Sequence, residues 1–168
     1  MDFSQEMYFR ILNDNLSESP NRNVSNGVLL MSSYQDQYNL YYAGLRVDGT
    51  AIIKKKRNGE YTTLAQEKIF PGEYGRSSNP NLLPKNQAIG IRMETRNTGA
   101  GVDISLYTDL DGSGEWELAA SAMDEPNPLK GPLYGPGFAG IRTDFMDVEF
   151  WGYRAYGLSE SVLEFGAT

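Results

Sequence analysis

The chain has 168 residues with 15 basic and 22 acidic side chains, a formal net charge of −7, and it contains neither histidine nor cysteine. These absences exclude a thiolate nucleophile, an imidazole-based catalytic triad, a disulfide and an ordinary zinc or copper site. A pI near 4.6 argues against nucleic-acid binding, which needs a basic surface. A hydrophobic share of 40% indicates one globular domain with a real core.

The N-terminal residues have neither a basic region nor an apolar segment of the kind that a signal peptide carries. No apolar run approaches the length of a membrane span, so we expect no membrane insertion. We expect an extracellular or cell-surface location, with the signal peptide outside this sequence, and a place within a larger multidomain protein.

Alternating apolar and polar residues predict ten short strands. In chain order they are expected at residues 7–12, 28–34, 40–47, 51–56, 61–65, 88–95, 102–108, 116–122, 137–142 and 148–156. Asp48-Gly49 and Asn58-Gly59 separate three of them, and these dipeptides are strong hairpin signals. The proline-containing segments 70–86 and 124–136 are predicted to be surface loops.

Short strands at this spacing are typical of an all-β jelly-roll sandwich of two antiparallel sheets. We expect this domain to span residues 1–157, with residues 158–168 as a C-terminal extension or linker.

Three segments carry a family resemblance. They are residues 42–46 ahead of Asp48-Gly49, the aromatic strand at Trp116 after an acidic turn, and Gly137-Phe138-Ala139-Gly140-Ile141-Arg142 followed by Asp147-Val148-Glu149-Phe150. Together they resemble the concanavalin A-like lectin and glucanase superfamily, in its LamG-like jelly-roll form. The resemblance implies a concave sheet that holds saccharide, in a superfamily of lectins, carbohydrate-binding modules, glucanases and polysaccharide lyases. The Glu-x-Asp-x-x-Glu catalytic strand of the related glucanases is absent from this chain.

Strand alternation predicts which polar side chains face away from the core. We expect seven of them to lie together on one concave sheet: Tyr42, Arg46, Lys54, Lys56, Arg92, Glu94 and Arg142. Tyr134, in a proline- and glycine-bearing loop, is a further binding candidate. Arginine forks bind carboxylates or sulfates, and tyrosine rings stack on sugars, so the ligand predicted here is a polysaccharide that could be anionic.

Other interpretations of these residue types stay open. The run of cations at 54–57 could instead be a solvated hairpin edge that discourages aggregation. Trp116 and Trp151 are expected in the core or half-buried beside it rather than as sugar platforms.

Three acidic residues are candidate ligands for a structural calcium ion: Asp109, Asp111 and Asp147. Clustered oxygens in the loop 109–115 suit a hard cation, although the same residues make a good hairpin loop. For Asp147 the calcium role is implied by the resemblance. A solvent-exposed or turn-capping aspartate would have the same sequence signature.

Three functions follow as alternatives. The favoured one is a lectin-like, carbohydrate-binding domain. A second is a polysaccharide lyase, in which Tyr42 abstracts the proton next to a uronate carboxylate while Arg46 or Arg92 neutralises that carboxylate. The third is a structural or adhesive interaction module. The sequence leaves open whether the protein is an enzyme.

Overall fold

The computed structural model describes residues 2–158, and within that range the chain forms ten strands without a helix. The strands are β1 (Phe3–Asp14), β2 (Gly27–Asp36), β3 (Asn39–Arg46), β4 (Thr50–Arg57), β5 (Glu60–Lys68), β6 (Ile89–Asn97), β7 (Val102–Asp109), β8 (Glu117–Asp124), β9 (Phe138–Thr143) and β10 (Met146–Gly157). All ten predicted strands are confirmed. The described residues therefore include no helix that could span a membrane. Residues 159–168 of the predicted extension lie outside the described range.

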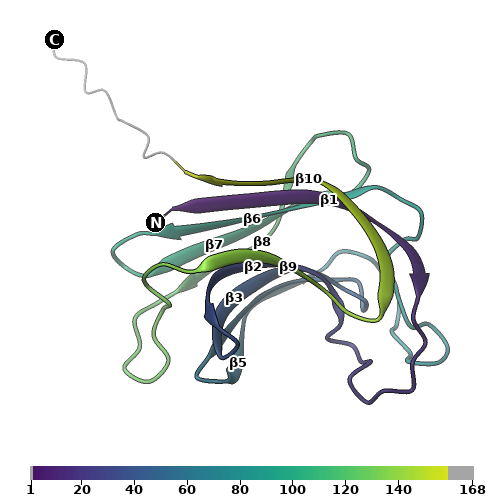
Figure 1. The fold of residues 1–168 in the computed structure, drawn as a ribbon, viewed down its shortest axis with the longest axis horizontal. Coiled ribbons are helices and arrows are strands. Elements are labelled where there is room, and N and C mark those ends of the chain that lie inside the picture. Colours follow the sequence, from purple (N-terminus) through teal and green to yellow (C-terminus); the bar gives the residue numbers. More distant parts are fainter. Residues whose placement is uncertain (1, 159–168) are drawn as a thin grey trace, which may run out of the picture.

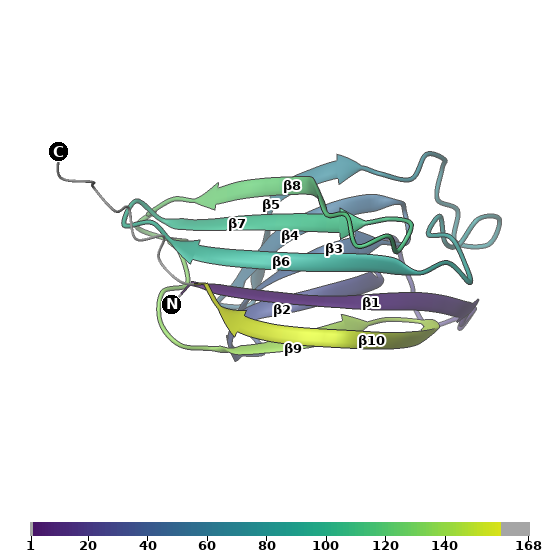
Figure 2. The same ribbon diagram turned by 90° about the horizontal axis from the view of Figure 1, so that it is seen from above.

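The strands form two five-stranded layers (Figure 1). Sheet A has the order β10-β1-β6-β7-β8, which can be followed from strand to strand in Figure 2, and sheet B has the order β5-β4-β3-β2-β9. Neighbouring strands are antiparallel in both sheets. The predicted sandwich of two antiparallel sheets is confirmed.

Turn residues fix the meander of β3, β4 and β5. Asn58 and Gly59 have φ angles of 51° and 85°, the left-handed conformation that a tight hairpin between twisted strands requires. Gly49, between β3 and β4, has a φ of 77°. The Asp-Gly and Asn-Gly signals therefore mark real turns, and they set the register in which Tyr42 pairs with Lys54.

Alternating residues from both sheets fill the space between the layers. Sheet B contributes apolar side chains such as Leu45 and Ile53, and sheet A contributes Phe9, Ile91 and Leu106, all fully buried. Burial of this surface from water is the main favourable contribution to folding. Because these positions face inward, the residues between them face outward and are available for binding.

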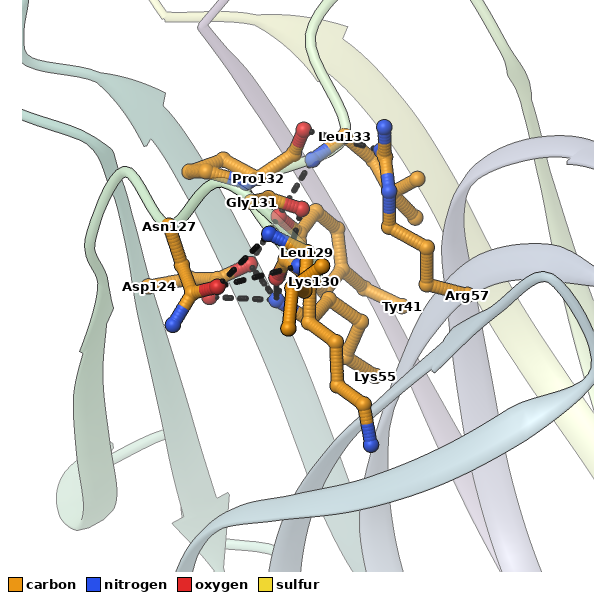
Figure 3. A network of polar contacts seen from close by, with 10 residues as sticks. All are labelled: Tyr41, Lys55, Arg57, Asp124, Asn127, Leu129, Lys130, Gly131, Pro132 and Leu133. Atoms are coloured by element: carbon orange, nitrogen blue, oxygen red, sulfur yellow. Dashed lines mark hydrogen bonds and ion pairs between the residues drawn. The ribbon is translucent and has the colours of Figure 1, made fainter.

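A polar network crosses the core at one end of the sandwich (Figure 3). The Lys55 ammonium lies 2.6 Å from one carboxylate oxygen of Asp124 and 2.8 Å from the other, and Tyr41 donates to the same carboxylate at 2.6 Å. The Lys55 side chain points inward and the residue is only 2% exposed. For Lys55 the interpretation of residues 54–57 as a solvated hairpin edge is therefore wrong, and β4 is an interior strand between β3 and β5.

The loop between β8 and β9 is held by this network. Lys55 also donates to the carbonyl of Lys130, Arg57 donates to that of Pro132 at 3.1 Å, and the Leu133 amide donates to the Tyr41 hydroxyl at 2.8 Å. The predicted surface loop is confirmed, and these bonds fasten it across the end of sheet B.

Candidate functional site

The outer face of sheet B carries a hollow of about 560 Å³. Its aromatic and charged lining comes from β3, β4, β5, β9 and the two residues after β9: Tyr42, Lys54, Tyr61, Arg142, Asp144 and Phe145. Amide and hydroxyl side chains from the segment between β1 and β2 form the rest of the polar wall: Asn21, Asn23, Ser25 and Asn26. This is a concave surface that combines aromatic rings with both donors and acceptors of hydrogen bonds.

Tyr42 links the hollow to a second, smaller apolar cluster of sheet B. Leu29 and Ile52 are fully buried although they face away from the core between the sheets, and Tyr42 packs with them at 6% exposure. Met31 and Tyr34 cover the cluster at its edge. The central strands of sheet B are therefore apolar on both faces, and this packing holds the Tyr42 ring in place.

Cations surround the two tyrosine rings. The Lys54 nitrogen lies 5.2 Å from the centre of the Tyr61 ring, and the Arg142 guanidinium carbon lies 5.9 Å from that of Tyr42. The two rings meet edge to face at 6.2 Å. Lys56 adds a third cation, 4.8 Å from the Tyr61 ring. Cation–π contacts of this kind fix rings and charges relative to each other.

Several cationic side chains crowd together in and beside the hollow. Partial burial lowers the pKa of Lys54, and the nearby Arg46 and Arg142 cations lower it further, because crowding of like charges disfavours the protonated ammonium. Asp144 offsets part of this charge at 3.0 Å from Arg142. An anionic group placed beside Lys54 would relieve the repulsion.

The structure brings together part of the predicted binding set. Tyr42, Lys54 and Arg142 line the hollow. Lys56 lies on the same face, because its ammonium contacts the Tyr61 ring. Arg46 does not line the hollow. Its guanidinium forms an ion pair with Asp48 at 3.1 Å and donates a hydrogen bond to the Val24 carbonyl at 3.0 Å.

The prediction that Arg92 and Glu94 share this sheet is wrong. Both lie on β6 in sheet A. Arg92 donates to Glu6 at 2.7 Å and covers the Trp116 ring at 4.2 Å, while Glu94 accepts from Arg96 at 3.1 Å. Alternation correctly places both side chains on an outer face, but it does not say which of the two sheets that face belongs to.

Tyr134 is half exposed in the loop before β9, where its backbone carbonyl accepts a hydrogen bond from Gln35 at 3.1 Å. Its side chain is not part of the lining of the hollow.

The expectation for Trp151 is also wrong. Trp151 pairs with Tyr8 on the outer face of sheet A and is 42% exposed. Trp116 precedes β8 and stands half-buried against Tyr8, with ring centres 5.6 Å apart. Both rings are therefore outside the core.

The acidic loop after β7 is organised by hydrogen bonds. Asp109 accepts from the Tyr8 hydroxyl at 2.9 Å and from the amides of Gly112, Ser113 and Gly114 at 2.7 to 3.1 Å. Asp147 is exposed on β10. Among residues 2–158 no three acidic side chains gather as a metal site would require. Calcium binding by Asp109, Asp111 and Asp147 stays a prediction, and the geometry favours the hairpin-loop interpretation of residues 109–115.

Several residues that line the hollow are not among the predicted binding residues. Tyr61 had a usable signal, because it follows the Asn-Gly turn and pairs with Lys56 across the predicted hairpin. Asp144 directly follows β9 and is two positions after Arg142, so strand alternation places both side chains on the same face. The asparagines at 21, 23 and 26 carry no periodic pattern, and only the fold brings them against sheet B.

The site geometry gives little support to the lyase alternative. Burial raises the pKa of Tyr42 to about 12, and the neighbouring arginines offset this only in part. A tyrosine base would need its pKa lowered towards neutrality. Arg92, one of the two cations assigned to the uronate carboxylate, lies on the opposite sheet.

Comparison with solved structures supports the fold. The chain resembles the carbohydrate binding module CBM66 from Bacillus subtilis at a TM-score of 0.57 and 17% identity, over 92% of this chain and 74% of that one. It also resembles a mutant of the GH43 protein BlXynB from Bacillus licheniformis, at 0.55 and 14% identity, over 94% of this chain and 28% of that one. No protein-family model and no curated sequence matches the chain. At these identities the likeness shows a shared β-sandwich.

Proposed function

We propose that this domain binds a polysaccharide in the hollow of sheet B, and that the preferred chains carry carboxylate or sulfate groups. The observation that carries the proposal is the meeting of Lys54 and Arg142 with the rings of Tyr42 and Tyr61 in one concave surface. Aromatic faces suit the C–H faces of sugar rings, and the cations suit acidic substituents.

Two further observations favour binding over other roles. The fold is similar to that of a protein described as a carbohydrate binding module. The asparagine and serine side chains at the wall supply donors and acceptors that match sugar hydroxyls.

The direct test is a glycan array that contains neutral, uronate-containing and sulfated chains. We expect retention of the uronate or sulfated chains. Lys54→Gln should weaken that binding because it removes the half-buried cation from the hollow. Arg96→Gln is the matched control, because it removes the same charge from sheet A. Equal binding by parent and Lys54→Gln, or binding of neutral chains alone, would contradict the anionic site.

A further inference from the structure

A second group of aromatic residues lies on the outer face of sheet A, opposite the hollow. Tyr8 on β1 and Trp151 on β10 lie side by side on neighbouring strands as offset, nearly parallel rings, with planes 17° from parallel and centres 6.1 Å apart. Trp116 continues the row on the other side of Tyr8 at 5.6 Å. We call these three residues the aromatic row. Within it Tyr8 and Trp151 are nearly parallel, whereas Trp116 is tilted by 48° from Tyr8.

Neighbouring residues hold the row in place. The Tyr8 hydroxyl donates to Asp109 at 2.9 Å, and the Arg92 guanidinium lies 4.2 Å from the Trp116 ring. Gly90 lies beneath the row on β6, where a Cβ atom would come 2.8 Å from Trp116 and 2.9 Å from Tyr8. The glycine therefore lets both rings lie close to the sheet. Rings that are fixed before binding lose little conformational entropy when a ligand docks.

The charges beside the row are already paired. Arg92 binds Glu6 at 2.7 Å, and Arg10, which lies 5.6 Å from the Trp151 ring centre, pairs with Glu149 at 3.6 Å. The surface thus offers aromatic faces and hydrogen-bonding groups with balanced charge, in contrast to the cationic hollow on sheet B. Balanced charge gives an anionic chain no advantage over a neutral one.

The geometry points to a second saccharide-binding surface on sheet A, centred on Trp151 and Tyr8, that takes a neutral polysaccharide. Trp151 is 42% exposed, so its ring is accessible to a ligand on this face. The ligand chain would lie across β10 and β1 with its sugar rings on the aromatic faces. This surface is independent of the proposed anionic site, because the two occupy opposite faces of the sandwich.

The chain supplies its own probe for this site, because its two tryptophans are both in the row. We would titrate the protein with hydroxyethylcellulose, galactomannan and laminarin while recording tryptophan emission, and measure retardation in native gels that contain each polymer. We expect an emission change and retardation with at least one polymer, and little effect of added salt. Absence of both signals with all three polymers would overturn the proposal.

Variants assign the signal to the row. Trp151→Ala should weaken binding at least about tenfold, a loss of about 1.4 kcal/mol. Phe150→Ala is the matched control, because Phe150 is a neighbouring exposed aromatic that pairs with Phe9 on the inner side of the sheet. Tyr61→Ala, in the hollow of sheet B, should leave the emission change intact.

Other outcomes would overturn the proposal in distinguishable ways. Loss of neutral-polymer binding in Tyr61→Ala but not in Trp151→Ala would place that binding on sheet B. Sedimentation showing that the parent self-associates and Trp151→Ala does not, without a difference in polymer binding, would make the row a contact between copies of the chain. Failure of the anionic site would appear in the tests with anionic chains, such as the Lys54→Gln comparison, and would leave the neutral-polymer signals of the parent and of Trp151→Ala unchanged.

Discussion

Lys55 holds together the polar network at one end of the sandwich. It neutralises Asp124, which also accepts from Tyr41, and all three residues are buried. Removing one partner of a buried ion pair leaves an uncompensated charge away from water. We expect Lys55→Met to lower the free energy of unfolding by about 3–5 kcal/mol, measured by urea denaturation.

The control and the double variant separate charge from packing. Lys56→Met, one position along β4, should cost less than about 1 kcal/mol because its side chain contacts rings at the surface. Lys55→Met combined with Asp124→Leu should recover part of the loss, since no buried charge then remains unpaired. This account would be contradicted if the double variant lost as much free energy of unfolding as the two single variants lose together.

Arg142 and Arg92 give a residue-level test of which sheet binds the anionic ligand. Arg142→Lys keeps the charge in the hollow but loses the planar fork, so we expect the affinity for an array-identified anionic chain to fall by about 1–3 kcal/mol. Arg92→Lys should leave that affinity unchanged, because Arg92 lies on sheet A. Titration calorimetry measures both. The reverse ranking would move the site to sheet A.

At the scale of the strand, β3 shows how closely sheet B is packed. A Cβ atom on Gly44 would lie 2.3 Å from the Val28 carbonyl oxygen of β2, so a side chain there must push the two backbones apart. We expect Gly44→Ala to destabilise the fold by about 1–3 kcal/mol in urea unfolding. Gly140→Ala on β9 is the control, because its new Cβ would meet only the flexible end of Met31 at 3.1 Å. An equal loss of unfolding free energy in the two variants would contradict the close contact between the backbones of β2 and β3 at Gly44.

The positions of strands could be predicted from sequence because alternation and turn residues are local. Alternation also orients side chains, and it implies that Lys55, two positions after the inward Ile53, faces the core. The run of four cations obscured that signal. Asp124, the partner of Lys55, is 69 residues away along the chain, so the pair could not be predicted without the fold.

Alternation does not decide which sheet a strand joins. The chain passes from β5 in one sheet to β6 in the other through a long irregular segment, which has no periodicity from which the crossing could be read. For that reason alternation alone groups Arg92 and Glu94 with Lys54, although they lie on the other sheet. Tyr42, Lys54 and Arg142 could be grouped correctly because β2, β3, β4 and β9 share one sheet.

For the whole molecule, alkaline pH should destabilise the fold through its buried tyrosines. Burial raises the pKa of Tyr42 from 10.0 to about 12 and also raises that of Tyr41, so between these values the folded chain binds more protons than the unfolded one. The stabilising contribution is complete below the unfolded pKa and is lost as pH rises through the folded pKa. We expect the midpoint urea concentration of unfolding to fall as pH rises from about 10 to about 12. The fall should be smaller in Tyr42→Phe, and an equal fall would contradict the assignment.

The net charge of −7 and the cationic hollow act on an anionic ligand in opposite directions. The whole protein repels a polyanion at long range, whereas Lys54 and Arg142 attract it only on contact. Salt screens the long-range repulsion, over about 10 Å at 0.1 M, and also weakens the contacts. We therefore expect rising salt to weaken binding through faster dissociation, without a slower association rate. Surface plasmon resonance on an immobilised, array-identified anionic chain measures both rates. An association rate that falls steeply with salt would show that a positive surface larger than this hollow captures the ligand.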